Sequence, residues 1–280
     1  MPQPKFTIVD YRIDTPIMVN SQPKVHLTAI SKALPINGKP EPVLSSIDLV
    51  ANIGEFVSII GPSGCGKSTL LNIIAGLDEA DEGTVDLGEI SPNDRLGNVG
   101  YMQQKDLLLP WRTVLDNAIL GLELLGIHRK EAQKKAGTLI ETFGLKGFED
   151  QYPFRLSGGM RQRAAFLRTM LLDQELVLLD EPFGALDALT RAQMQRWLLK
   201  LWESWGKTIL LITHDVDEAI LLSDRIYVLT ARPGRVKAAI KVDILRPRDL
   251  RAATHADFAG LRSHLMDLLQ EEPMVGYAGS

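Results

Sequence analysis

The chain has 280 residues, 45% of them hydrophobic and 24% charged, which suits one large globular domain or two modest ones. Its 31 basic residues are outnumbered by 35 acidic ones, and the net charge of −4 argues against a dedicated nucleic-acid-binding protein. No run approaches the roughly 18 apolar residues of a membrane span, the amino terminus lacks the apolar core of a secretory signal, and a single cysteine suits a reducing compartment.

The amino-terminal part predicts an extension followed by two strands. Residues 1–22 are polar and contain proline, so we expect a poorly ordered or peripheral extension. Residues 24–30 alternate in polarity and predict the first strand. A turn-rich insert at 35–40 separates it from a second strand over 45–51.

The strongest motif follows the next apolar run. Residues 55–60 are typical of a buried parallel strand, and 67–75 have apolar residues at helical spacing. Between strand and helix the chain fits G-x-x-x-x-G-K-[ST], the pattern of a phosphate-binding loop, with Gly61, Pro62, Ser63, Gly64, Cys65, Gly66, Lys67, Ser68 and Thr69. The glycines let backbone N–H groups face an anion, Lys67 supplies a cation for the β- and γ-phosphates, and the Ser68 hydroxyl can bind Mg²⁺. The sequence therefore predicts a nucleotide-phosphate site.

Cys65 lies inside this loop. Because Lys67 and a helix N-terminus are close in sequence, we expect a lowered thiol pKa and reaction with a maleimide that blocks nucleotide binding.

The middle of the chain predicts a change from strands to helices. Short strands are expected near 84–87 and 99–103. Apolar stripes then predict helices over 114–125 and 129–143. The whole stretch from about 105 to 160 follows the phosphate loop and precedes the later motifs, which suggests an inserted helical subdomain.

A second candidate anion site opens the next helix, expected over 161–172. Ser157 is a good N-cap, and the backbone N–H groups of Gly158 and Gly159 can bind an anion with its hydroxyl. A Ser-Gly-Gly helix start is usually only a cap. A phosphate loop in the same chain favours the functional interpretation.

Two acids end the following strand, which is expected over 175–179. In a phosphate-loop nucleotidase the second Mg²⁺ ligand sits at the carboxyl end of such a strand, so Asp180 fits this role directly or through water. Glu181 is one residue further and faces the other side, where it could orient or deprotonate an attacking water.

A histidine ends the next strand. A helix capped by Asp187 is expected to run to about Ser204, and a strand over 208–212 follows. His214 lies between this strand end and a capping-box-like helix start at Asp215 and Glu218. This position favours a functional role for the histidine over a purely structural one. Closing strands over 225–229 and 236–242, and an amphipathic helix over 255–270 that serves packing or an interface, complete the chain.

The motifs in this order resemble the ATP-binding subunit of an ABC transporter: the phosphate loop, Gln104, Leu156-Ser157-Gly158-Gly159-Met160, Asp180-Glu181, residues 184–187 and His214. The resemblance covers about residues 24–245. It implies an α/β fold, with a P-loop (RecA-like) ABC ATPase core over 23–245, an antiparallel β edge, the helical subdomain and a helical tail over 246–280.

The resemblance also implies roles for the motif residues. Gln104 would meet Mg²⁺ and the attacking water, and residues 184–187 would form an inter-subunit loop. Ser157-Gly158-Gly159 would bind the γ-phosphate across a dimer. His214 would hold the γ-phosphate and the lytic water beside the catalytic Glu181.

The implied cofactors are ATP and Mg²⁺, and the implied partners are other subunits. These are a second ATPase subunit, identical or a close paralogue, integral membrane permease subunits and, indirectly, a periplasmic or extracellular solute-binding protein. No nucleic acid is expected. Such a subunit lies peripherally on the cytoplasmic face of the membrane.

Two substrate groups remain open. Leu108-Leu109-Pro110-Trp111 and residues 180–187 are similar to importers of nitrate, sulfonates and taurine, whereas residues 101–113 also resemble importers of pyrimidine precursors of thiamine. We expect residues 107–111 to receive the membrane subunit, because so apolar a stretch is costly to expose. The alternative is that Trp111 packs inside the helical subdomain.

One position departs from the family pattern. The family usually has an aromatic residue near the end of the first strand that stacks on adenine, and Leu34 stands there. We expect weak discrimination between bases, unless Phe6 or Tyr11 of the extension covers the base instead.

Two other classes of function compete with an importer subunit. Soluble ABC-type ATPases that act on DNA or ribosomes usually carry coiled-coil or basic insertions, and none is visible. A nucleotide-binding regulator without turnover would not need Glu181 and His214.

Overall fold

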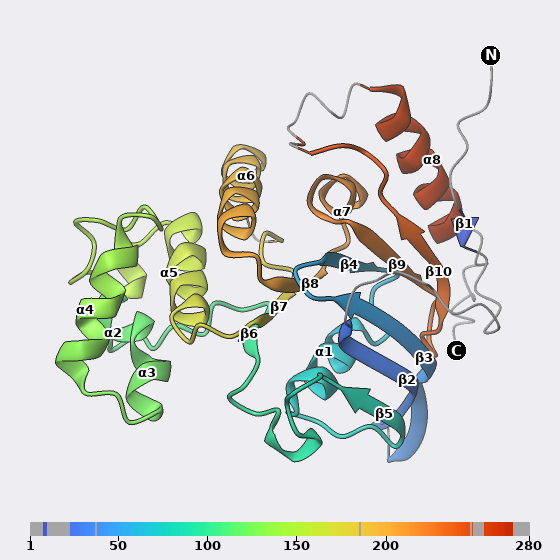
Figure 1. Ribbon diagram of the computed structural model, residues 1–280, viewed down its shortest axis with the longest axis horizontal. Coiled ribbons are helices and arrows are strands. Elements are labelled where there is room, and N and C mark those ends of the chain that lie inside the picture. Colours follow the sequence, from blue (N-terminus) through green and yellow to red (C-terminus); the bar gives the residue numbers. More distant parts are fainter. Residues whose placement is uncertain are drawn as a thin grey trace, which may run out of the picture.

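The protein is described here by a computed structural model, which covers residues 8–9, 23–36, 38–184, 186–246, 248 and 255–270. It contains two sheets (Figure 1). The larger is seven-stranded in the order β1-β10-β9-β4-β8-β7-β6, and the smaller is an antiparallel sheet in the order β3-β2-β5. None of the helices in these ranges is both long and apolar enough to cross a bilayer.

Strands open the chain, helices fill its middle, and strands and helices alternate from residue 176 to residue 229. The strands are β1 (Ile8–Val9), β2 (Pro23–Ile36), β3 (Lys39–Asn52), β4 (Phe56–Ile60), β5 (Glu82–Asp86), β6 (Gly100–Met102), β7 (Leu176–Asp180), β8 (Thr208–Ile212), β9 (Arg225–Leu229) and β10 (Val236–Lys241). The helices are α1 (Lys67–Ala75), α2 (Val114–Ala118), α3 (Leu120–Leu124), α4 (Arg129–Ile140), α5 (Gly158–Met170), α6 (Ala188–Trp205), α7 (Val216–Leu222) and α8 (Ala256–Gln270).

The parallel strands bring the motif residues to one edge of the large sheet. β4, β7 and β8 are buried along their whole length, because helices cover both faces of a parallel sheet. β8 pairs with β4 on one side and with β7 on the other, with Ile59 and Asp180 both opposite Ile212. The carboxyl ends of these three strands therefore meet, as the predicted α/β core requires.

Helices α2 to α5 gather at one side of the molecule, away from the small sheet (Figure 1). Their apolar faces share one core with α6. Phe143, after α4, and Phe166 of α5 meet Trp197 of α6 edge-to-face, with ring centroids 4.8 and 5.5 Å apart. This grouping supports an inserted helical unit, whose boundaries at about 105 and 160 stay a prediction.

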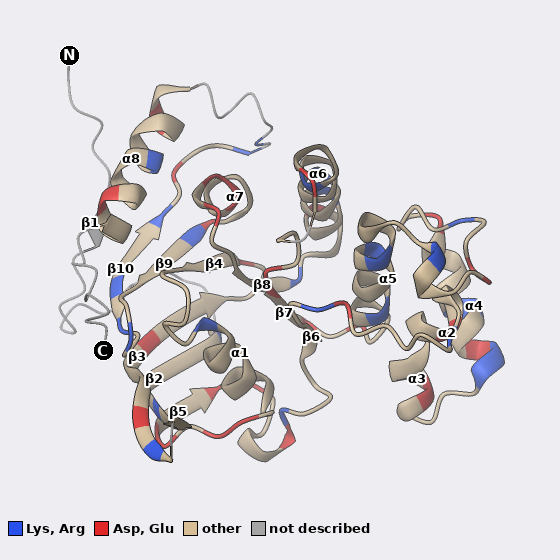
Figure 2. Ribbon diagram, turned by 180° about the vertical axis from the view of Figure 1, so that it is seen from behind, with Lys and Arg blue, Asp and Glu red and all other residues tan. Residues whose placement is uncertain are grey.

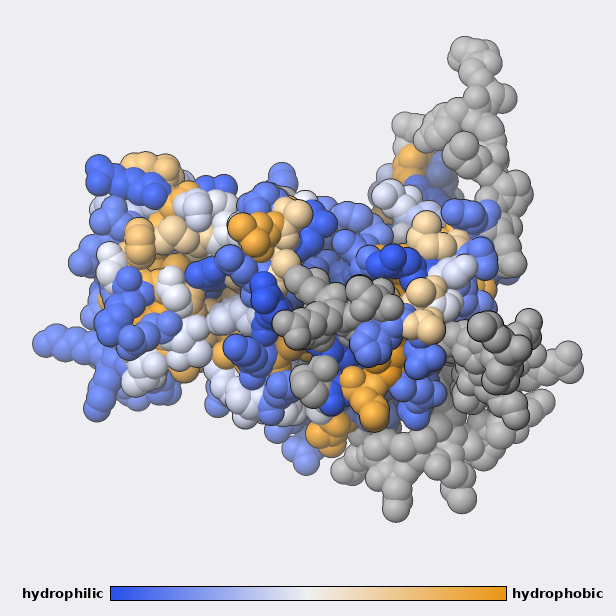
Figure 3. Space-filling model, turned by 90° about the horizontal axis from the view of Figure 1, so that it is seen from above, coloured by the Kyte–Doolittle hydropathy of each residue, from blue (hydrophilic) through white to orange (hydrophobic). Residues whose placement is uncertain are grey.

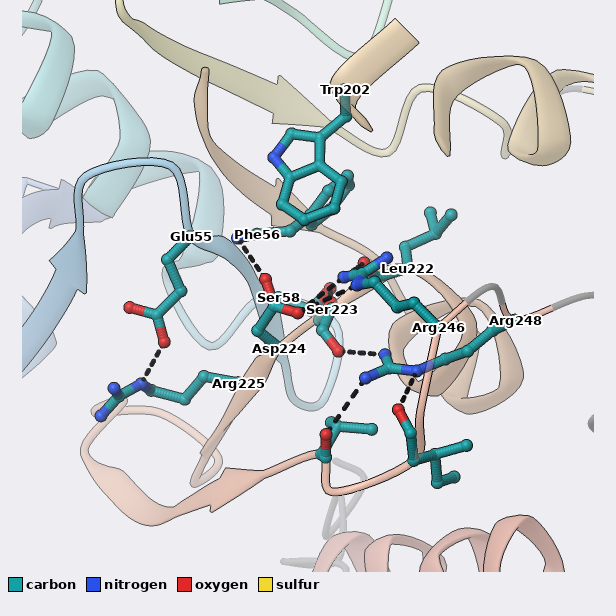
Figure 4. Close-up of polar contacts among 12 residues, drawn as sticks. Glu55, Phe56, Ser58, Trp202, Leu222, Ser223, Asp224, Arg225, Arg246 and Arg248 are labelled. Carbon is teal, nitrogen blue, oxygen red and sulfur yellow. Dashed lines mark hydrogen bonds and ion pairs between the residues drawn. The ribbon is translucent and has the colours of Figure 1, made fainter. Parts of the chain in front are cut away.

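The segment after β10 is fixed to the carboxyl end of α7. The buried Arg248 guanidinium donates to the backbone oxygens of Ile220, Ser223 and Val242 (Figure 4). Arg246 pairs with Asp224 at 2.8 Å and lies 4.2 Å from the ring centroid of Trp202. These guanidinium groups donate to the carbonyls at the end of a helix, which otherwise lack partners. The segment after β10 thus packs against the core, as one of the two roles predicted for the tail requires.

The prediction of a turn-rich insert between two short strands was wrong. β2 and β3 are each 14 residues long, because the ladder continues through the expected insert to Ile36 opposite Lys39. Within residues 1–22, Ile8 and Val9 form the edge strand β1 against β10. The rest of that extension, including Phe6 and Tyr11, lies outside the described residues.

The helix expected over 114–125 is two short helices that meet at Ile119.

Charged residues of both signs are interspersed over the described elements (Figure 2).

Candidate functional site

The phosphate-binding loop connects β4 to α1 at the edge where the parallel strands end. Gly64 and Gly66 have φ values of 77° and 104°, which glycine adopts without strain. A Cβ on Gly66 would lie 2.7 Å from Leu44, so the loop also packs too closely for a side chain there. The Lys67 ammonium donates to the carbonyls of Gly61 and Pro62 at 2.8 and 2.9 Å. These contacts hold a cation at the centre of the loop.

Asp180 ends β7 beside Ser68 of α1. Burial raises the pKa of the Asp180 carboxyl, and the neighbouring Ser68 hydroxyl lowers it as the smaller effect. A hydroxyl and a carboxylate side by side are hard oxygen donors that suit Mg²⁺. The described residues contain no cluster of three or more His, Cys, Asp or Glu able to hold a metal. The donor set thus fits an ion that takes few protein ligands and several phosphate or water oxygens.

Glu181, the residue after Asp180, meets two polar side chains. Its carboxylate accepts a hydrogen bond from Nε2 of Gln104 at 2.9 Å and lies 3.5 Å from Nδ1 of His214. The backbone of Glu181 has φ 45°, a left-handed conformation that costs energy for a residue with a side chain. A hydrogen bond from Glu181 N to Ile212 O of β8, 3.0 Å long, holds it there. The strained turn aims the carboxylate at Gln104 and His214.

A cavity of about 330 Å³ joins the phosphate loop to these residues. Its lining is mostly polar: Val43, Ser63, Gly64, Gly66, Lys67, Ser68, Thr69, Gln104, Glu181 and Arg232. Sequence reasoning missed Val43 and Arg232. They belong to β3 and to the β9–β10 hairpin, and only the order of strands in space brings them to the loop.

A larger cavity of about 860 Å³ lies at the opposite edge, near the start of β7 and β8. Its lining contains two ion pairs, Lys24–Glu175 at 2.5 Å and Lys207–Asp173 at 2.8 Å. The charges of these four side chains are therefore already neutralised by one another. Ligands of open parallel sheets bind at the carboxyl ends of the strands. The smaller cavity is therefore the candidate site.

Ser157, Gly158 and Gly159 lie elsewhere. The Ser157 hydroxyl accepts a hydrogen bond from Met160 N at 3.3 Å and caps α5, as predicted. The three residues are not among the described residues that line the phosphate-loop cavity. Gly159 packs against α6 so closely that a Cβ would lie 2.7 Å from Thr190. A single chain thus presents two separate candidate anion sites.

Residues 107–111 form an apolar loop that buries Leu108 and exposes Leu107, Pro110 and Trp111. Trp111 is 71% exposed and Leu107 is 49% exposed, so the alternative that Trp111 packs inside the helical group is wrong. The loop is nevertheless fixed, because the buried Asn117 amide donates to the carbonyls of Leu109 and Arg112. On the face seen in Figure 3, outside the grey parts, apolar side chains occur only in small scattered groups. A rigid loop that exposes a tryptophan is a candidate contact surface.

Cys65 does not have the environment that would lower its thiol pKa, so that prediction was wrong. Its side chain is 1% exposed and points into the core. Burial raises the pKa of the thiol, and the opposing charge of Lys67, with Nζ 3.9 Å from Sγ, is the smaller effect. The prediction failed because proximity in sequence did not reveal which way the side chain points.

The helix start after His214 is only half of a capping box. Asp215 Oδ1 accepts from Glu218 N at 3.1 Å, but Asp215 N donates to Thr213 Oγ1 instead of to Glu218. Glu218 is buried beside Asp215. Its pKa is raised to about 8, mainly by burial and to a smaller extent by the charge of Asp215. Arg191 of α6 lies 3.5 Å from the Asp215 carboxylate and donates to Leu186 O. These contacts connect the segment at 184–187 with the histidine.

Comparison with known proteins agrees with this geometry. The family described as "ABC transporter" matches residues 44–184. An uncharacterized ABC transporter ATP-binding protein of Methanocaldococcus jannaschii is 47% identical over 89% of this chain and 92% of its own length. The formylaminopyrimidine import ATP-binding protein ThiZ of Halalkalibacterium halodurans is 42% identical, over 83% and 92% respectively. The taurine import ATP-binding protein TauB of Escherichia coli K12 is 43% identical over 74% and 81%.

A solved structure also matches. It is a dimeric ATP-binding cassette in a post-hydrolysis state bound to ADP and Pi, with a TM-score of 0.69 and 33% identity. The match covers 79% of this chain and 100% of that one.

Proposed function

Because this chain belongs to the ABC transporter family and is an ABC ATPase, we propose that its ATP hydrolysis drives the import of a small anionic or heterocyclic solute through separate membrane subunits. The observation that carries the proposal is the arrangement around Glu181. A strained carboxylate, which lines the same cavity as Lys67, meets Gln104 and His214. This arrangement suits in-line attack of water on a terminal phosphate.

We assign each side chain a role in hydrolysis. The loop N–H groups, the α1 N-terminus and Lys67 bind the phosphates of ATP. Glu181 orients the attacking water and accepts its proton, while His214 holds the γ-phosphate. Ser68, Gln104 and Asp180 would together hold Mg²⁺, which would neutralise charge on the phosphates.

We propose that the complete site forms between two chains. Ser157, Gly158 and Gly159 bind anions through a capped helix N-terminus and lie apart from the phosphate-loop cavity of their own chain. The ATP-binding cassette that matches this structure is a dimer. In the proposed dimer each ATP lies between the phosphate loop of one chain and Ser157 of the other.

We propose that Leu107 and Trp111 contact the permease, which places the chain peripherally on the cytoplasmic face of the membrane. Their loop begins three residues after Gln104, so movement of the permease can reach the glutamine that faces Glu181. For the solute, a sulfonate, taurine or nitrate is proposed first and a pyrimidine thiamine precursor second. The relatives named for taurine and for formylaminopyrimidine are almost equally similar, at 43% and 42% identity.

Phosphate release from MgATP by purified Glu181→Gln tests the catalytic assignment. Loss of one general base costs about 10²–10⁴-fold in rate, and the affinity for ATP should not change. Glu203→Gln, an exposed carboxylate on α6, is the matched control and should hydrolyse ATP normally. Near-normal turnover of Glu181→Gln would remove Glu181 from its role. Purification of the chain with a polytopic membrane protein separates an importer subunit from a soluble ATPase that acts on DNA or ribosomes.

A further inference from the structure

The phosphate-loop cavity has two ends, and the proposed function accounts for only one. Gln104 and Glu181 follow β6 and β7, and Asp180 lies beside Ser68, so the terminal phosphate belongs at that end. In the sheet order β9-β4-β8-β7-β6, β9 lies on the other side of β4. An extended nucleotide therefore directs its ribose and base toward the β9–β10 hairpin.

Arg232 of that hairpin lines the cavity. Its Nε donates to Gly64 O at 3.2 Å, and the side chain is exposed. No carboxylate pairs with Arg232 among the residues that the structure describes. None of the described lining residues is aromatic, and Leu34 is half-buried against the apolar core instead of facing the cavity. Among the described lining residues, Arg232 thus offers the one planar side chain that pairs with no other side chain.

The hairpin is held firmly against the loop. Gly234 N donates to Val43 O at 2.8 Å, and Gly234 O accepts from Ser45 N at 3.0 Å. The Thr230 hydroxyl binds Pro233 O and Arg235 N at 3.2 and 2.9 Å. Because these bonds fix the backbone, only the side chain of Arg232 has to become ordered when it contacts a ligand.

We propose that Arg232 covers the base of the bound nucleotide, with its guanidinium plane against the ring and Val43 at the same end of the cavity. A guanidinium is planar, weakly hydrated and positively charged, and it stacks on aromatic rings. This contact suits any purine, so it explains how a chain with Leu34 can hold a base without a ring of its own. The inference rests on the proposed function, because it requires that the cavity bind a nucleotide.

Binding of ADP and of pyrophosphate, each measured by calorimetric titration, separates a base contact from a phosphate contact. ADP contains the base and two phosphates, whereas pyrophosphate contains only the phosphates, and neither is hydrolysed. Arg232→Ala should raise the Kd of ADP about tenfold, the size of a partly desolvated cation–π contact. The Kd of pyrophosphate should stay within about twofold of the wild type.

Two further variants serve as controls. Arg235→Ala removes the same charge from an exposed position of the same hairpin, outside the cavity lining, and should leave both Kd values unchanged. Arg232→Lys keeps the charge without the plane and should remain several-fold weaker than the wild type for ADP.

Three results would overturn the inference. They are an unchanged Kd of ADP in Arg232→Ala, an equal loss of ADP and pyrophosphate binding, and full recovery in Arg232→Lys. A wild-type chain that binds neither ligand would refute the proposed function instead.

Discussion

Gly234 fixes the distance between the β9–β10 hairpin and the phosphate loop, so an alanine there should disturb both. A Cβ at this position would lie 2.3 Å from Cys65 O and 3.5 Å from a methyl carbon of Leu44. The oxygen belongs to the backbone of the loop, so no side chain can rotate away. Gly234 is also bonded to Val43 and Ser45 through its N–H and C=O groups.

The expected magnitude follows from this overlap. Ordinary contact requires about 1 Å more than the 2.3 Å available, so the hairpin or the loop must move by about that much. Overpacking of this kind costs about 1–3 kcal/mol. For a chain of this size that lowers the melting temperature by roughly 2–10 °C. Displacement of the loop should also weaken ADP binding, since its N–H groups must converge on the phosphates.

Thermal unfolding and ADP titration of Gly234→Ala measure both effects. Gly137→Ala is the matched control, because Gly137 lies inside α4 with open space around the added methyl group. That change should stabilise the chain by about 0.5–1 kcal/mol through helix propensity. A Gly234→Ala protein with unchanged melting temperature and ADP affinity would refute the reasoning.

Three shorter predictions follow from burial and exposure. Native protein should resist a maleimide because Cys65 is 1% exposed and burial raises its thiol pKa; rapid labelling seen by mass spectrometry would contradict this. Glu218 has a folded pKa of about 8, above its unfolded value of about 4.3, so the free energy of unfolding should fall with pH between those values. In denaturant titrations, the free energy of unfolding of Glu218→Gln should rise relative to that of the wild type by up to about 1.4 kcal/mol per pH unit between those values. An equal pH dependence of the two proteins would contradict this. Trp111→Ala should keep its melting temperature and basal ATPase and lose coupled transport, whereas a large drop in melting temperature would indicate a packing role.

The sequence was most informative where the signal is local. The bounds of α1 and β8 agree with the prediction to the residue, because a phosphate loop and a buried β-branched run each mark their own ends. The caps at Ser157 and Asp187 were also predicted, since a cap needs only its own side chain and the next turn.

What depends on distant contacts could not be predicted. The long β2–β3 hairpin is stabilised by pairing across the chain, which overrides the turn residues near Pro35. The inward direction of Cys65 and the position of Arg232 both depend on β9 lying next to β4. No property of those residues in the sequence reveals that neighbour.

The central claim, that each ATP site is shared by two chains, is tested most directly in the Glu181→Gln background, where ATP persists. Light scattering after size exclusion gives the oligomeric state, and the nucleotide content of each peak gives the occupancy. Glu181→Gln should form a dimer with ATP and retain one nucleotide per chain. Adding Ser157→Arg should leave the chain monomeric with undiminished ATP affinity, because the phosphate loop of its own chain is intact. A dimer that persists with Arg at position 157, or a monomer that has lost ATP, would contradict the claim.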